Sequence, residues 1–374
     1  MEFINPARLS LTVALLGLAL GAVFGAVGRR THFCALGAVS DIVAMGDWNR
    51  MRMWLLAIAV AMLGANGLEL AGVVDLFKSI YRNPSLPWLS HIVGGGMFGA
   101  GMVLGSGCGS KSLIRAGAGN LKSWVVLAFL AISAYATLKG WPAVWRAAYL
   151  DPLALPLAAH GIAGQDVPSL LAHFTGVERF GLQAGVSLAI AGGLLFLVLH
   201  RRKFRSFGVL LGGTTVGLLV AAGWWVTGYW GYGENPETLE MVFFGTNSRG
   251  PESLTLVAPV AYTLEWWMLG SDKSLHLTFG IGVTLGIVLG SFCDAMASRS
   301  FRWEGFASPA DTARHIIGGI LMGVGGVLAL GCTIGQGITG LSTLALGSFI
   351  AFFAIVAGAV ATLKIEYWKI SRAA

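Results

Sequence analysis

Nine apolar stretches of about 20 residues run along the chain, and each is long enough to cross the hydrocarbon core of a bilayer. They cover residues 9–28, 53–74, 88–107, 121–138, 179–199, 207–228, 275–292, 314–331 and 343–363. Only 11% of the residues are charged and the mean hydropathy is +0.73, so the chain carries too little charge to cover a soluble globule of 374 residues. We therefore predict an all-α polytopic membrane protein that forms a single membrane domain over residues 1–374. The same composition excludes a soluble enzyme and a disordered chain.

The basic residues are distributed unevenly between the loops on the two sides of these spans. Of the 25 lysines and arginines, 17 fall on one side and 8 on the other. Cytoplasmic loops are enriched in Lys and Arg, so this asymmetry places the N-terminus outside and the C-terminus in the cytoplasm. The net charge of +7 is then a topology signal, and the expected partner is the lipid bilayer, with no nucleic acid.

An internal repeat organises the spans. The segment from His91 to Cys108 aligns without a gap with the segment from His315 to Cys332, and ten of 18 positions are identical. A weaker pair ends at Cys34 and at Cys293. Paired halves with opposite orientation are typical of transporters, whose site lies where the repeats meet.

We therefore predict a first repeat half at 9–138, linker spans and outer loops at 139–274, and a second half at 275–364. The halves are expected to be inverted, with short re-entrant helix or loop segments. One conflict remains open: inverted halves would place the Cys34 and Cys293 segments on opposite sides, whereas the span count places them on the same side.

All four cysteines lie at the ends of glycine-rich spans. A lone buried cysteine is usually a small hydrophobic residue, but here every cysteine occupies a repeat-equivalent position. Glycines such as Gly107, Gly109 and Gly331 permit a broken helix and a close approach of backbone to a ligand. Free N–H groups at such a break favour an anion, and Gln336 adds a neutral donor. A thiol is a weak donor with a polarisable sulfur, so the combination favours a sulfur-bearing anion over a hard cation.

Other residues are weaker candidates for a site. His91 and His315 open equivalent spans and could contact a substrate or a proton, although histidines at such positions more often have structural roles. Lys111 follows Cys108 and could attract an anion, but it also lies where the topology expects basic residues. The cysteines are isolated on separate segments, and the usual clustered spacings of metal ligands are missing. No metal site and no cofactor are therefore expected.

Four ordered motifs resemble the signature segments of the YeeE/YedE family of sulfur transporters. They are GRRTHFCALGAVSD, GSGCGSKSLIRAGAGN, GSFCDAMASRSFRW and GCTIGQGITG, and the resemblance extends from about residue 11 to 364. It implies nine spans with short segments that enter from both faces, and thiosulfate uptake across the bacterial inner membrane. It also implies that Cys34, Cys108 and Cys332 pass the anion along a narrow path. Cys293 stands where the family motif commonly lacks a cysteine, so its role stays open.

The resemblance further implies a small cytoplasmic sulfur-carrier protein, TusA-like or YeeD-like, as a partner. The favoured function is a thiosulfate transporter that is not an enzyme. Two alternatives stay open: a membrane component that hands over persulfide sulfur, and a transition-metal permease. A stable persulfide on a cysteine would favour the first, and metal retained on purification would favour the second.

Overall fold

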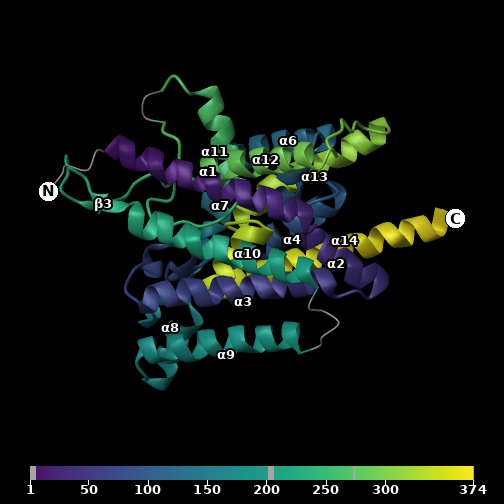
Figure 1. Ribbon diagram of the computed structural model, residues 1–374. Coiled ribbons are helices and arrows are strands. Elements are labelled where there is room, and N and C mark those ends of the chain that lie inside the picture. Colours follow the sequence, from purple (N-terminus) through teal and green to yellow (C-terminus); the bar gives the residue numbers. More distant parts are fainter. Residues whose placement is uncertain (1–5, 201–205, 273–274, 374) are drawn as a thin grey trace.

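The computed structural model describes residues 6–200, 206–272 and 275–373, and helices dominate it (Figure 1). The α-helices are α1 (Pro6–Arg30), α2 (Ala35–Met45), α3 (Asn49–Leu70), α4 (Trp88–Leu104), α5 (Gly109–Gly117), α6 (Leu121–Lys139), α7 (Trp141–Tyr149), α8 (Val167–Thr175), α9 (Arg179–Leu199), α10 (Phe207–Trp225), α11 (Val257–Met268), α12 (Phe279–Ala297), α13 (Pro309–Leu328) and α14 (Leu346–Ala373). The short helices are η1 (Leu76–Lys78), η2 (Ile80–Arg82), η3 (Asp151–Leu153), η4 (Leu157–His160) and the π-helical η6 (Val226–Trp230) and η7 (Gly335–Gly340).

Eight helical segments in the described part of the chain are long and apolar enough to cross a membrane. They are Pro6–Met45, Asn49–Leu70, Trp88–Gly117, Leu121–Lys139, Arg179–Leu199, Phe207–Trp230, Phe279–Ala297 and Leu346–Arg372. Each contains or overlaps a predicted span, which confirms a polytopic all-α membrane protein. The ninth predicted span, 314–331, forms α13, which is long enough but less apolar because its first turns carry Asp311, Arg314 and His315.

Glycines bring the long helices into close contact. On α1, a Cβ at Gly21 would lie 2.3 Å from the carbonyl oxygen of Val283, and on α12 a Cβ at Gly286 would lie 2.2 Å from that of Leu18. Only glycine allows two backbones to approach this closely, as in small-xxx-small membrane interfaces. Gly17 lies beside Phe279 and Gly25 beside Ile287, so α1 and α12 run parallel.

The other long helices pair in the same manner. Parallel contacts also join α3 with α10, α4 with α14, and α6 with α13, whereas α4 and α13 cross antiparallel. The packing is symmetric when each helix of the first group, α1, α3, α4 and α6, is matched in order with α10, α12, α13 and α14. This matching turns the pair α1 with α12 into the pair α10 with α3, and the pair α4 with α14 into the pair α13 with α6. The strong repeat, α4 against α13, is therefore inverted as expected. The weaker sequence pair is not inverted, because α1 and α12 run parallel and their cysteine segments share one side. The correspondence also includes α10, which lies before residue 275, where the second half is expected to begin.

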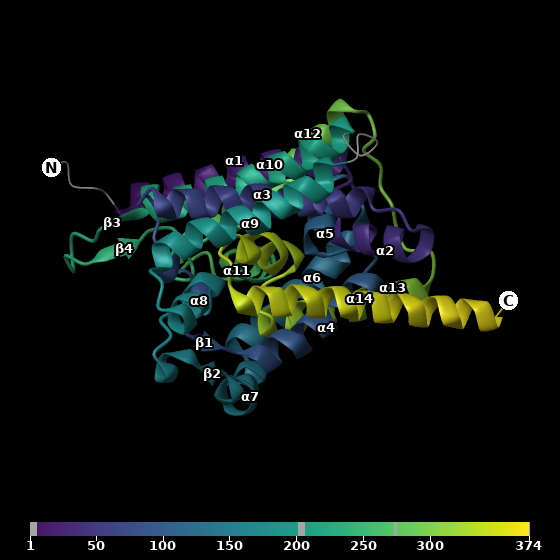
Figure 2. The same cartoon turned by 90° about the horizontal axis from the view of Figure 1, so that it is seen from below.

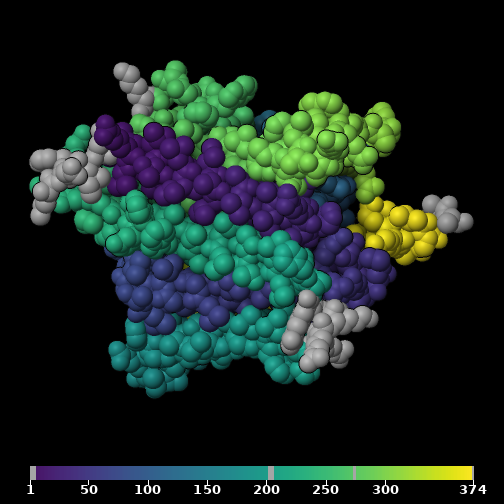
Figure 3. All heavy atoms as spheres, in the orientation of Figure 1, coloured from purple at the N-terminus to yellow at the C-terminus, as the bar shows by residue number. Residues whose placement is uncertain are grey.

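The two ends of the bundle differ. Figure 2 shows α8 and the hairpin of β3 (Tyr232–Glu234) and β4 (Met241–Phe243) at the end where α1 begins, and the C-terminus of α14 at the other. A second antiparallel pair joins β1 (Ser85–Leu86) to β2 (Leu155–Pro156). The apolar stretch 255–269 forms α11, whose 12 residues are too few to cross a bilayer. One face of the bundle consists of α1, α10, α3 and α9 as adjacent bands (Figure 3).

Candidate functional site

Three of the four cysteines lie just beyond a break at the end of a long helix. Cys34 follows α1, Cys108 follows α4, and Cys332 follows α13. In each break, the residue two positions before the cysteine has a left-handed backbone conformation: His32 (φ 53°), Ser106 (φ 56°) and Leu330 (φ 55°). Such a conformation costs a residue other than glycine about 1–2 kcal/mol. The surrounding packing must therefore hold the three breaks in place.

A shared hydrogen bond closes each break. The residue after the left-handed one donates its backbone N–H to the carbonyl oxygen five residues earlier. The three bonds are Phe33 to Gly28 (3.0 Å), Gly107 to Met102 (2.9 Å) and Gly331 to Gly326 (2.8 Å). This is the Schellman pattern, which satisfies a terminal helix carbonyl and stops the helix. The helix breaks expected at Cys108 and Cys332 are thus present, and Cys34 follows a third one. Cys293 does not end its span as expected, because α12 continues through it to Ala297.

Each cysteine then begins a short helix. Cys34 is the N-cap of α2, where its Sγ accepts a hydrogen bond from the Gly37 N–H at 3.4 Å. Cys108 is the N-cap of α5, and its Sγ lies 3.2 Å from the Ser110 hydroxyl. The Sγ of Cys332 accepts from the Gly335 N–H at 3.4 Å. The thiols therefore take the capping position that Ser, Thr, Asp or Asn usually occupies.

The three thiols form a connected series inside the bundle. The side chains of Cys34 and Thr333 both interact with the thiol of Cys108. Because Thr333 follows Cys332 directly, Cys108 occupies the middle of the series. Cys34 is 6% exposed, and Cys108 and Cys332 are fully buried.

Three buried polar atoms beside the thiols have no conventional hydrogen-bond partner among the described residues. They are Trp54 Nε1, Thr333 Oγ1 and Gln336 Oε1. Trp54 stacks on Phe33, next to Cys34, with ring centroids 4.9 Å apart. An unpaired buried polar atom is costly, so its presence indicates a role beyond packing.

A lysine lies near both Cys34 and Cys108 and distinguishes their surroundings from those of Cys332. Lys111, in the first turn of α5, interacts electrostatically with both thiols. A Cβ at Gly107 would lie 3.3 Å from the Lys111 side chain, and Gly109 begins α5. We call Cys34, Cys108, Ser110 and Lys111 the two-thiol site.

Cys332 has different neighbours. The backbone of Leu256 interacts with its thiol, and Tyr81 lies close enough to interact with it electrostatically. The Tyr81 hydroxyl also interacts with the Thr255 side chain. We call Cys332, Tyr81 and Thr255 the one-thiol site. Sequence reasoning missed Tyr81, in the short helix η2, and Thr255, in the loop before α11, because both lie outside the repeated motifs.

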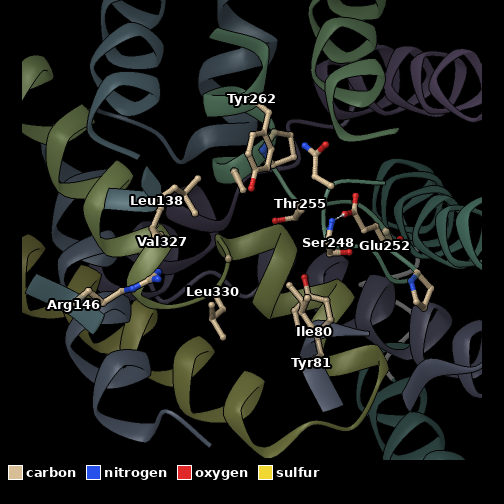
Figure 4. A pocket seen from close by; sticks show the side chains of 17 residues that line it. Ile80, Tyr81, Leu138, Arg146, Ser248, Glu252, Thr255, Tyr262, Val327 and Leu330 are labelled. Carbon is tan, nitrogen blue, oxygen red and sulfur yellow. Dashed lines mark hydrogen bonds between the residues drawn. The ribbon is translucent and has the colours of Figure 1, made fainter. Parts of the chain in front are cut away.

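A cavity of about 230 Å³ opens beside the one-thiol site (Figure 4). Tyr81, Thr255 and Gly331 belong to its wall, together with Arg146 of α7 and Glu252 of the loop before α11. Cys332 follows Gly331 directly in the sequence, but its thiol is fully buried behind this wall and does not line the cavity. Arg146 and Glu252 were not among the site residues expected from the sequence.

The remaining candidates lie farther from the thiols or hold the scaffold. His91 is buried with its Nδ1 3.2 Å from the Ala329 carbonyl oxygen, and Gln336 donates to the same oxygen at 2.7 Å. Both side chains thus bind the last turn of α13 before Cys332. The Nδ1 of His315 lies 2.8 Å from the Asp311 carbonyl oxygen of the same helix, α13. Cys293 is exposed on α12 and is not among the neighbours of the three buried thiols.

A family model described as "Sulphur transport" matches residues 30–361. The thiosulfate transporter TsuA of Escherichia coli (strain K12) is 27% identical over 349 residues, with 87% of each chain covered. The thiosulfate transporter TsuA of Spirochaeta thermophila is 27% identical over 371 residues, covering 91% of this chain and 96% of the relative.

These relatives are named as transporters and not as enzymes, in agreement with the expectation from the sequence. The family model spans all three helix breaks and the cysteines that follow them. The chain therefore belongs to the sulphur transport family, the YeeE/YedE family.

Proposed function

We propose that this protein takes up thiosulfate across the bacterial inner membrane, with its N-terminus outside and its C-terminus in the cytoplasm. In this proposal the anion passes along the thiols in the order Cys332, Cys108, Cys34. The observation that carries it is the central position of Cys108, in contact with Cys34 on one side and with Thr333 on the other. The choice of thiosulfate as the substrate is based on the names of the two relatives, which are thiosulfate transporters.

The two kinds of donor suit the two ends of thiosulfate. Its terminal sulfur is soft and polarisable, and the S–H groups of the two-thiol site offer weak donors to it. Its oxygens are hard acceptors, for which the unpaired Trp54 N–H and Thr333 hydroxyl provide donors. Neutral thiols suit a path for an anion because a thiolate would repel it. Lys111 adds a positive charge at the two-thiol site.

The proposal includes a TusA-like or YeeD-like sulfur carrier that receives the sulfur at the cytoplasmic end. Among the described residues, no group of three His, Cys, Asp or Glu side chains is arranged to hold a metal ion, so no observation favours a metal permease.

The test is uptake of ³⁵S-thiosulfate by proteoliposomes that contain equal amounts of wild type, Cys108→Ala, Cys332→Ala or Cys293→Ala. We expect Cys108→Ala and Cys332→Ala to lose about tenfold or more of the uptake, because each removes a donor to a charged group that contributes about 1.5–3 kcal/mol. Cys293→Ala is the matched control and keeps wild-type uptake. Wild-type rates in both buried variants would contradict the thiol path, and no uptake by the wild type would contradict thiosulfate as the substrate.

A further inference from the structure

The cavity beside the one-thiol site contains a carboxyl group that the thiol path does not use. Glu252 lines this cavity, and its Oε1 accepts a hydrogen bond from the Ser248 N–H at 2.5 Å. The Thr227 hydroxyl of η6 donates to the Glu252 carbonyl oxygen at 2.5 Å, and the Glu252 N–H donates back to that hydroxyl. The backbone of Glu252 is therefore fixed, and its carboxyl group stays beside the cavity.

No basic side chain in the described part of the chain forms an ion pair with Glu252. Arg146 lies across the cavity in Figure 4, where its Nε is 3.5 Å from an Asp151 carboxyl oxygen but has no hydrogen-bond partner. Any anion that enters the cavity thus meets, besides Arg146, a carboxyl group that forms no ion pair with a basic side chain of the described residues.

The other titratable groups around Glu252 do not compensate for its charge. Tyr81 of η2 and Tyr262 of α11 both interact with it and line the same cavity. Burial raises the pKa of Tyr81, so that hydroxyl stays neutral across the physiological range. Burial also raises the pKa of Glu252, and hydrogen bonds from Ser248 and Asn247 partly oppose this.

We propose that Glu252 is a specificity-determining residue that admits the anion to the cavity when its carboxyl group is protonated and excludes it when ionised. The proposal rests on the proposed uptake of thiosulfate. A protonated carboxyl group donates its O–H to an oxygen of the anion, whereas a carboxylate is an acceptor with the same sign of charge. Like charges brought together at a binding surface oppose binding strongly. The proton comes from water on the cavity side and remains on Glu252.

The predicted signature is uptake that falls as the pH on the cavity side rises. Thiosulfate itself stays a dianion across the physiological range, so the substrate does not supply this dependence. Above the pKa of Glu252, the protonated fraction falls by about tenfold per pH unit, the limit for one titrating group. Lowering the pH restores the protonated carboxyl group and with it the uptake.

The experiment measures ³⁵S-thiosulfate uptake by proteoliposomes at external pH values from about 5.5 to about 8.5, with the internal pH held constant. Glu252→Gln keeps an acceptor for the Ser248 N–H and cannot ionise, so its uptake should be independent of pH. Glu252→Asp keeps a titrating group and should keep a pH slope. Glu237→Gln, at an exposed position of the preceding loop, is the matched control and should follow the wild type.

A Glu252→Gln variant that keeps the wild-type slope would overturn the proposal, as would a wild type whose uptake does not depend on pH. If Glu252→Gln does not fold, the wild type in detergent provides a second readout. Thiosulfate should then raise its Tm more at low than at high pH, and equal shifts would overturn the proposal. Absence of both uptake and stabilisation by thiosulfate at every pH would instead contradict the proposed function.

Discussion

The two-thiol site and the one-thiol site are built on the same backbone but offer different chemistry. At both, a long helix ends in a left-handed residue, Ser106 or Leu330, two positions before the cysteine. Cys108 then meets a second thiol, whereas Cys332 meets the backbone of Leu256 and the side chain of Tyr81. The two repeats thus share the backbone conformation at the helix break but differ in the hydrogen-bond donors around the cysteine. One site presents mainly soft donors and the other mainly N–H and O–H donors.

The largest effect should come from making the two sites alike. Cys34→Thr replaces the second thiol of the two-thiol site by a hydroxyl, which can still cap α2 but lacks the soft sulfur. We expect thiosulfate uptake to fall by about tenfold, equivalent to ~1.4 kcal/mol, because the hydroxyl keeps a donor but lacks the polarisable sulfur that suits the terminal sulfur of thiosulfate. Circular dichroism should show unchanged helix content. Full uptake by this variant would mean that a hydroxyl serves as well as a thiol, and the distinction between the sites would fail.

A smaller effect is expected at the one-thiol site. Tyr81→Phe removes the hydroxyl that interacts with Thr255 and keeps the ring. A neutral hydrogen bond contributes about 1 kcal/mol, so uptake should fall by about threefold to fivefold. Because burial raises the pKa of Tyr81 well above its usual value, this hydroxyl is protonated at neutral pH. The loss should therefore be the same at pH 6 and pH 8, chosen to bracket neutrality. A loss confined to one of these pH values would show that Tyr81 takes part in the titration assigned to Glu252.

The smallest effect tests the feature that the two sites share. Ser106→Gly and Leu330→Gly each place glycine where the backbone is left-handed. Glycine adopts this conformation without the cost of about 1–2 kcal/mol, but it also adds freedom to the unfolded chain. We expect a net gain of up to about 1 kcal/mol in the free energy of unfolding at both positions, measured as a rise in Tm of the detergent-solubilised protein. A gain at one position and a loss at the other would show that the two breaks are not equivalent.

Sequence alone determined the membrane class, the positions of the long helices and the breaks at the three motif cysteines. These properties are local: about 20 apolar residues require a spanning helix, and the glycine-rich ends permit a close turn. The inverted relation of the two strong repeat segments also follows from sequence, since their similarity is high and the number of spans between them sets their directions.

Tertiary structure decided which side chains surround each helix break. Tyr81 of η2 and the loop residues Thr255 and Glu252 lie in segments without a recognisable sequence pattern, and only packing brings them to one cavity. Arg82, which is fully buried and donates to Glu69 at 2.6 Å, is a further example of a partner that sequence spacing does not reveal.

The parallel pairing of α1 with α12 has the same origin. Its glycines were visible in the sequence, but glycine permits close approach to any helix, and the partner is chosen by the fit of whole surfaces. Local sequence therefore fixes where the chain breaks, and long-range packing fixes what each break can bind.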